Sequence, residues 1–148
     1  IGVLGEHPLD DRFAVLKASR HALILMTPPD HPWRGRAAVA IDELAGQPMV
    51  MREAGSVTRR AFDAALATAG ITPTVALEIG SREAVREAVA AGLGLGVVQE
   101  PELGHDSRIG WARITGTEIA AGETVVCLDE RRQSRLIQRL ASIIADAG

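Results

Sequence analysis

The sequence predicts an α/β fold built from two lobes. Short apolar runs bounded by turn-forming residues, typical of strands, alternate along the middle of the chain with stretches that repeat apolar residues every three or four positions, typical of amphipathic helices. A strand–helix–strand–helix–strand order builds a parallel sheet with helices on its faces. A cluster of prolines within residues 28–32 then indicates a boundary between two lobes.

Eight strands are expected from the apolar runs. They lie at residues 1–4, 13–18, 22–27, 48–52, 75–79, 95–99, 109–114 and 124–129. Each run is short and is bounded by residues that favour turns. This number of strands excludes a helical bundle.

Three helices are expected from apolar stripes with a period of 3.6 residues. The stripes consist of Phe62, Ala65, Leu66 and Ala69, of Val85, Ala88 and Val89, and of Leu136, Ile137, Leu140 and Ile144. The first helix is predicted over residues 57–69 and the second over 82–91. Gly70 and Gly92 follow them, and glycine is the residue best suited to the left-handed position at a helix C-terminus.

The order of the elements also predicts the domain organisation. Residues 28–123 are expected to form one lobe, and residues 1–27 together with 124–148 are expected to form another. The reason is that the strand at 124–129 and the final helix have no strand partner nearby in the sequence. They would therefore return to the sheet begun by residues 1–27, so that two crossing strands join the lobes. Because the chain starts at Ile1 rather than Met and is immediately strand-like, we expect it to be a fragment of a longer protein.

Composition excludes several classes of function. The chain has 148 residues, with 16 Lys and Arg against 19 Asp and Glu, so its net charge of −3 gives no basic surface for DNA or an anionic membrane. The single cysteine, Cys127, cannot form an internal disulfide, and this favours the cytoplasm. No apolar stretch approaches the roughly 20 residues that a membrane helix needs. Neither metal-ligand spacing nor a nucleophile motif stands out, so we expect no cofactor, no metal site and no catalytic residue.

Four short motifs follow one another along the chain. They are LILMTPPDHP at residues 23–32, ELAGQPMV at 43–50, GSVTR at 55–59 and VAAGLGLGVV at 89–98. In this order and spacing they resemble the effector-binding domain of LysR-type transcriptional regulators. The glycines of the last motif leave a helix and enter a strand, whereas a nucleotide loop runs from strand to helix. They therefore indicate a helix end and close backbone packing rather than a phosphate cradle.

The resemblance implies a fold similar to the periplasmic binding proteins of type 2, with an effector held in the cleft between two α/β lobes. It also implies that DNA is bound only through a winged helix-turn-helix domain, which this chain lacks. The first two strand–helix units of the first lobe are expected to be absent as well. The family's antiparallel dimer would use the helix at 57–69 and the strand at 75–79, so a homo-oligomer is expected of the full-length protein.

The segment from Arg52 to Thr58 is the leading candidate for an effector site. A strand ends there, a glycine–serine turn follows, and a helix starts, so unpaired N–H groups and the positive helix end favour an anion. Ser56 or Thr58 would orient one ligand oxygen, and Arg52 would pair with a carboxylate or phosphate group. The structural alternatives remain open: Ser56 only caps the helix, and Arg52 only forms a salt bridge to Glu53 or Glu78.

Two further polar residues are expected at the same edge of the sheet. Ser81 follows the strand at 75–79, and Gln99 ends the strand at 95–99, where open α/β folds bind ligands. Capping of the second helix would by itself explain Ser81. Chain reversal before Pro101 would by itself explain Gln99.

Three functions compete on this evidence. The leading one is a domain that senses a small, anionic effector and controls an attached DNA-binding domain. The alternatives are a solute-binding receptor of a transport system with the same bilobal fold, and a small α/β enzyme. A helix-turn-helix upstream would favour the first, a signal peptide the second, and a base or nucleophile with a partner residue the third.

Overall fold

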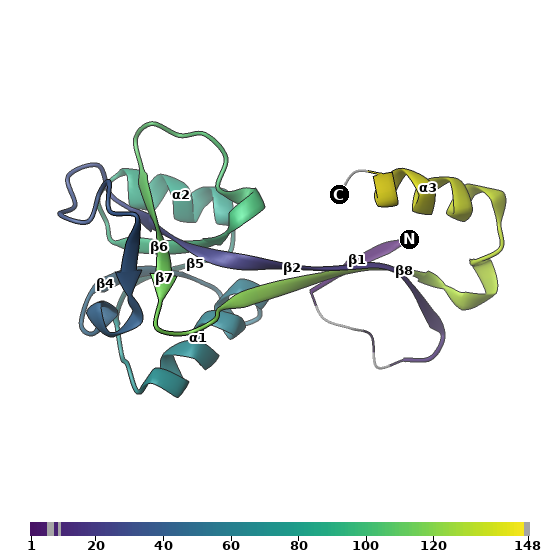
Figure 1. Ribbon diagram of the computed structural model, residues 1–148, viewed down its shortest axis with the longest axis horizontal. Helices are drawn as coiled ribbons and strands as arrows, with labels where there is room; N and C mark the ends of the chain where they lie inside the picture. The colour runs from purple at the N-terminus through teal and green to yellow at the C-terminus, as the bar shows by residue number, and fades with distance from the viewer. Residues whose placement is uncertain (6–7, 9, 147–148) are drawn as a thin grey trace. The chain divides into compact units, whose positions relative to one another are not determined.

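The computed structural model describes residues 1–5, 8 and 10–146 and divides into two compact units. The large unit consists of residues 21–121, and the terminal unit consists of residues 1–20 and 122–148. Strands β2 (Phe13–Thr27) and β8 (Ala120–Leu128) each continue from one unit into the other (Figure 1). Both boundaries between the units lie inside a strand, after residue 20 in β2 and after residue 121 in β8, where the sequence analysis expects lobe boundaries after residues 27 and 123.

The large unit contains the alternating strands and helices that the sequence predicts. Its elements are β3 (Ala38–Ala40), the 3-10 helix η1 (Ile41–Leu44), β4 (Pro48–Arg52), α1 (Val57–Ala69), β5 (Thr74–Ile79), α2 (Arg82–Ala90), β6 (Leu95–Gln99), the 3-10 helix η2 (Glu100–Glu102) and β7 (Gly110–Thr115). From β4 to β6 the bounds agree with the prediction to within one residue at each end.

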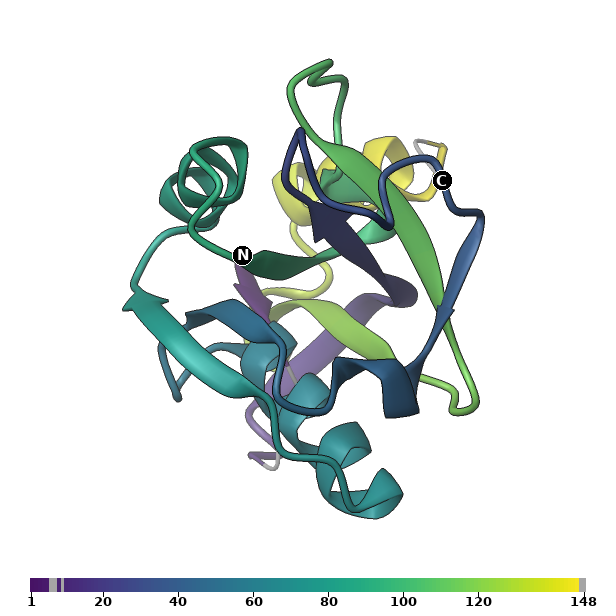
Figure 2. The same cartoon turned by 90° about the vertical axis from the view of Figure 1, so that its left-hand side faces the viewer.

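A mixed sheet forms the middle layer of the large unit. Strands β5, β4 and β6 are parallel neighbours in that order, β2 is antiparallel to both β6 and β7, and β3 is parallel to β7. Helices α1 and α2 lie on opposite faces of the parallel strands (Figures 1 and 2).

Two hydrophobic cores result, because successive side chains of a strand point to opposite faces of the sheet. On the α1 face, Met49, Met51, Leu95 and Val97 pack with Phe62 and Leu66 of the helix. On the α2 face, Val50 and Val98 pack with Val85, Ala88 and Val89.

Four glycines that follow the helices or lie at the start of β6 have the structural role that the sequence indicates. Gly70 and Gly92 adopt the left-handed backbone conformation, with φ of 69° and 82°. A Cβ atom on Gly94 would lie 2.7 Å from the carbonyl oxygen of Pro48, and one on Gly96 would lie 2.8 Å from Val89. Both glycines therefore allow close packing of β6 against its neighbours.

The terminal unit combines β1 (Gly2–Leu4), parts of β2 and β8, the 3-10 helix η3 (Asp129–Arg131) and α3 (Arg135–Asp146). Strand β1 is antiparallel to β8. Ala14, Cys127 and Ile137 form its small core, and the Cys127 thiol is buried there. No helix in the described part of the chain is long and apolar enough to cross a membrane.

One prediction about the strands is wrong, and two short elements were not predicted. The strands predicted at 13–18 and 22–27 are one strand, β2, because no glycine or proline interrupts the residues between them. The short strand β3 and the 3-10 helix η1 were not predicted, since three strand residues are too few to establish an alternating pattern.

Candidate functional site

The five residues predicted to bind an effector all lie at one edge of the large unit. Arg52 ends β4 and Gln99 ends β6, while Ser56 and Ser81 occupy the N-cap positions of α1 and α2 and Thr58 lies in the first turn of α1. Because β4, β5 and β6 are parallel, their carboxyl ends and the helix starts that follow them meet at this edge. Ligands of open α/β folds bind at such edges.

The same residues divide between the two faces of the sheet. Gln99 follows Leu95 and Val97 in the alternation of β6 and therefore lies on the face that α1 covers, where α1 begins at Val57. Arg52 instead lies near the start of α2, because its Nη2 donates a hydrogen bond to the carbonyl oxygen of Gly80 at 3.4 Å. The structure thus brings Ser56, Thr58 and Gln99 to one face and Arg52 and Ser81 to the other.

Arg52 forms an ion pair with its neighbour. Its Nε and Nη2 each donate a hydrogen bond to the carboxylate of Glu53 at 2.9 Å, and the Arg52 side chain is 20% exposed. The hydrogen bonds from Arg52 hold the pKa of the Glu53 carboxyl below its usual value. Of the two salt bridges considered for Arg52, the structure contains the one to Glu53.

The start of α1 lacks the groups that usually satisfy a helix N-terminus. Ser56 is the N-cap residue, but its side chain makes no capping hydrogen bond, and the first turn contains no acidic residue. Ser56 and Thr58 are nonetheless buried, at 9% and 6% exposure. The first-turn N–H groups of α1 and two buried hydroxyl groups are therefore together at this end.

Gln99 is the most unusual polar group at this edge. Its side chain is 6% exposed, and Oε1 has no hydrogen-bond partner among the described residues. A buried polar atom without a partner costs about 1–3 kcal/mol, so such an atom in a folded protein calls for an explanation. A ligand that brings a hydrogen-bond donor, such as a hydroxyl or N–H group, would supply this explanation.

Ser81 agrees with the structural alternative. Its hydroxyl oxygen accepts a hydrogen bond from the backbone N–H of Ala84 at 3.1 Å, and the residue is exposed. Capping of α2 accounts for a serine here.

Arg59 makes contacts at this edge that its sequence position does not predict. Its Nε donates to the carboxylate of Asp63 at 2.8 Å, and its Nη1 donates to Oε2 of Glu78 at 3.0 Å and to the backbone carbonyl oxygen of Arg52 at 2.8 Å. The spacing of four residues between Arg59 and Asp63 is the one signal in the sequence that indicates part of this arrangement.

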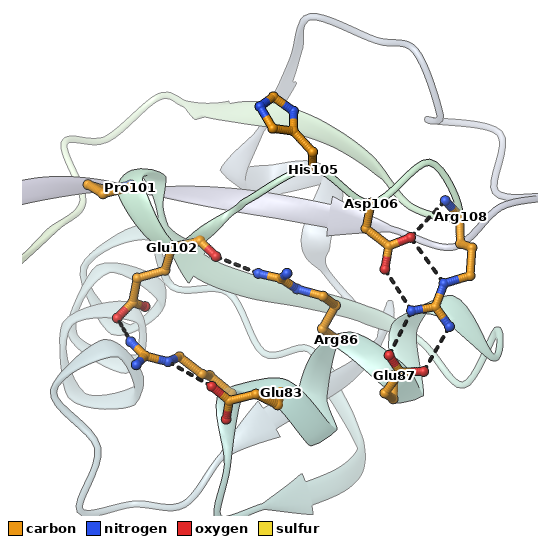
Figure 3. Close-up of a pocket in the computed structure, with 9 residues that line it drawn as sticks. Glu83, Arg86, Glu87, Pro101, Glu102, His105, Asp106 and Arg108 are labelled. Atoms are coloured by element: carbon orange, nitrogen blue, oxygen red, sulfur yellow. Dashed lines mark hydrogen bonds and ion pairs between the residues drawn. The ribbon is translucent and has the colours of Figure 1, made fainter.

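A charged groove of about 540 Å³ lies between the outer side of α2 and the loop that follows η2 (Figure 3). Arg108 binds the carboxylates of Glu87 and Asp106 there, and Arg82 pairs with Glu83 and Glu102. Because these charges neutralise one another, the groove is a weaker anion site than the start of α1. No three His, Cys, Asp or Glu residues of the described chain are grouped to hold a metal ion.

Comparison with known proteins shows which family model the sequence matches. The model of the LysR substrate binding domain matches residues 1–148. The RuBisCO operon transcriptional regulator of Allochromatium vinosum is 42% identical over 76 residues, which are 51% of this chain and 25% of the relative. The HTH-type transcriptional regulator CysL of Bacillus subtilis (strain 168) is 31% identical over 106 residues, which are 72% of this chain and 36% of the relative. The chain thus matches a quarter to about a third of the length of these regulators.

Solved structures share the fold. The regulatory domain of CcmR from Synechocystis, in complex with 2-PG, superposes with a TM-score of 0.81 at 24% identity and covers 98% of this chain and 71% of that one. The effector binding domain of QuiR in complex with shikimate gives a TM-score of 0.75 at 13% identity and covers 92% of this chain and 65% of that one. These likenesses confirm the predicted fold class, which is similar to the periplasmic binding proteins of type 2.

Proposed function

We propose, because this chain belongs to the LysR substrate binding domain family, that it is the part of a transcriptional regulator that senses a small anionic effector. The full-length protein would bind DNA through a separate domain and act in the cytoplasm. The large unit would be the second lobe of the effector domain, and the terminal unit would be part of the first. Relatives named as transcriptional regulators favour this function over a transport receptor or an enzyme.

The observation that carries the placement of the effector is the start of α1. The first-turn N–H groups, which the Ser56 side chain does not cap, and the positive end of the helix favour an anion, and no acidic residue of the first turn competes for it. Gln99 lies on the face where α1 begins, and because its buried Oε1 is an acceptor without a partner among the described residues, it would bind a hydroxyl or N–H group of the effector rather than its anionic oxygens. The Ser56 or Thr58 hydroxyl would orient one ligand oxygen.

Arg52 now points towards the start of α2, and in this proposal its guanidinium would turn towards the start of α1 and act there as a mobile counter-charge. Its present partner, Glu53, is itself a carboxylate, and the two side chains meet in the paired geometry that Arg also uses with phosphate. An anionic effector would displace Glu53 and take over the guanidinium. Binding changes the regulator only to the extent that the effector prefers one arrangement of the protein over another.

Calorimetric titration with inorganic phosphate, sulfate and 2-PG tests this placement. Ser56→Ala should weaken binding by about 0.5–1.5 kcal/mol, and Arg52→Ala should weaken it more, because a hydrogen bond to a charged group contributes roughly 1.5–3 kcal/mol. Ser81→Ala is the matched control, since its hydroxyl caps α2, and it should leave the affinity unchanged. Equal affinity in wild type, Ser56→Ala and Arg52→Ala would reject the site at the start of α1.

A further inference from the structure

We infer that Arg59 is a positioning residue for the effector site and holds the turn between β4 and α1 in its binding conformation. The expected effect of Arg59 on anion binding rests on the proposed function. The hydrogen bonds of Arg59 that hold the turn do not depend on any ligand. Arg59 lies in the first turn of α1, where a positive charge opposes the helix dipole by about 0.3–1 kcal/mol when exposed. A favourable role elsewhere would offset that unfavourable placement.

The contacts of Arg59 tie three elements together at the site. Nη1 donates to the backbone carbonyl oxygen of Arg52 at 2.8 Å, which fixes the last residue of β4. The same nitrogen reaches Oε2 of Glu78 on β5 at 3.0 Å, and Nε binds Asp63 one turn further along α1 at 2.8 Å. The Arg59 side chain is 15% exposed, while the side chains of Asp63 and Glu78 are 47% and 51% exposed, so the bond to the carbonyl oxygen of Arg52 is the most sheltered of its contacts.

The segment that Arg59 holds is the one that presents the anion-binding groups. Within it, the N–H of Glu53 donates to the carbonyl oxygen of Ile79 at 3.2 Å, and the N–H of Ser56 donates to the carbonyl oxygen of Glu53 at 2.9 Å. Without Arg59, the turn would keep these two backbone bonds and the bond from Arg60 Nη1 to the carbonyl oxygen of Gly55 at 2.9 Å, but it would lose its link to Glu78 on β5. The N–H groups at the start of α1 would then lose their common direction, and an anion would bind more weakly.

Two measurements on the 148-residue chain test the inference. The first is ligand-free amide hydrogen exchange of Glu53 and Ser56 by NMR. Arg59→Gln should accelerate exchange at both amides about tenfold or more, while the N–H of Leu93, which bonds to Ala88 at the other end of the large unit, should not change. Arg59→Lys keeps the charge but not the three-way geometry, so it should give an intermediate rate.

The second measurement is titration with inorganic phosphate and 2-PG. Arg59→Gln should weaken binding about tenfold, with partial rescue in Arg59→Lys. Arg108→Gln, which removes ion pairs to Glu87 and Asp106 in the same unit, is the matched control and should bind as wild type does.

The outcomes separate the two proposals. Unchanged exchange at Glu53 and Ser56 in Arg59→Gln would overturn the inference, as would unchanged affinity for an anion that the wild type binds. If the wild type binds neither anion while exchange accelerates as expected, the anion site fails and the role of Arg59 in holding the turn stands.

Discussion

Arg108 shows how strongly a single guanidinium can act on its neighbours in the large unit. It donates hydrogen bonds to both oxygens of Asp106 and of Glu87, and the backbone N–H of Arg108 also donates to Asp106. The hydrogen bonds from Arg108 lower the pKa of the Asp106 carboxyl from 3.8 to about 2. The same guanidinium lowers the pKa of the Glu87 carboxyl.

This arrangement predicts an acid-sensitive contact. A lowered pKa in the folded state means that the contact stabilises the fold above the unfolded pKa near 3.8 and loses this effect as pH falls towards 2. NMR titration of the side-chain carboxyl carbons should therefore find Asp106 still ionised at pH 3. In Arg108→Gln the pKa of Asp106 should rise towards its ordinary value, and an unchanged value would contradict the assignment to Arg108.

Gly94 carries a second prediction about a single residue. Its φ of 153° is unfavourable for any side chain, and a Cβ atom would lie 2.7 Å from the backbone oxygen of Pro48. Because this neighbour is backbone and cannot rotate away, Gly94→Ala should lower the free energy of unfolding by about 2–4 kcal/mol. Urea denaturation measures the difference. Gly80→Ala, which meets nothing within 4 Å, should stay within about 0.5 kcal/mol of wild type.

The two helices of the large unit start with serine but differ in how that serine is used. Ser81 caps α2 through a hydrogen bond from Ala84, whereas the Ser56 side chain makes no capping bond at α1. Ser81→Ala should therefore destabilise the protein by about 1 kcal/mol, while Ser56→Ala should have a smaller effect on stability. Chemical denaturation of both variants checks this. A larger loss in Ser56→Ala than in Ser81→Ala would show that Ser56 is a structural cap.

Comparison of individual elements shows what the sequence could predict. Strong periodicity and clear ends located α1, α2 and the parallel strands, because Gly70 and Gly92 mark helix ends by their backbone freedom. The continuity of β2 was missed, because single-strand patterns say little about where pairing persists. Arg59 was missed for a different reason: its partners Glu78 and the carbonyl of Arg52 come from other strands, and only the fold brings them together.

The position of the candidate residues at one edge follows from the order of the parallel strands. Residues that follow parallel strands must meet at one edge, and Arg52, Ser56 and Gln99 do so. These residues lie on two faces of the sheet because side chains alternate along each strand. Arg52 also forms an ion pair with Glu53. The missing partner of Gln99 Oε1 is a property of packing and has no signature in the sequence.

For the full-length protein, the contacts of Arg59 link the candidate site to an exposed surface. Through Glu78 they connect the end of β4 to β5, which is the last strand in the order of the sheet. An edge strand presents unpaired backbone groups, and β5 also exposes Val75 and Leu77, at 50% and 39%. Apolar side chains on an exposed edge favour a protein partner, which fits the homodimer that the family resemblance implies.

The final prediction concerns that dimer. If α1 and β5 provide one half of the interface and the partner's other lobe provides the second half, lysines on β5 should weaken the dimer, because charges would be buried against apolar groups. Val75→Lys with Leu77→Lys should raise the dimer dissociation constant of the full-length protein at least tenfold by sedimentation velocity. Leu93→Lys, at a comparably exposed position in the turn after α2, is the matched control and should leave the constant unchanged. The 148-residue chain should dimerise more weakly than the full-length protein. Equal association of the two would contradict the dependence on the remainder of the first lobe, and unchanged association of the β5 variant would remove β5 from the interface.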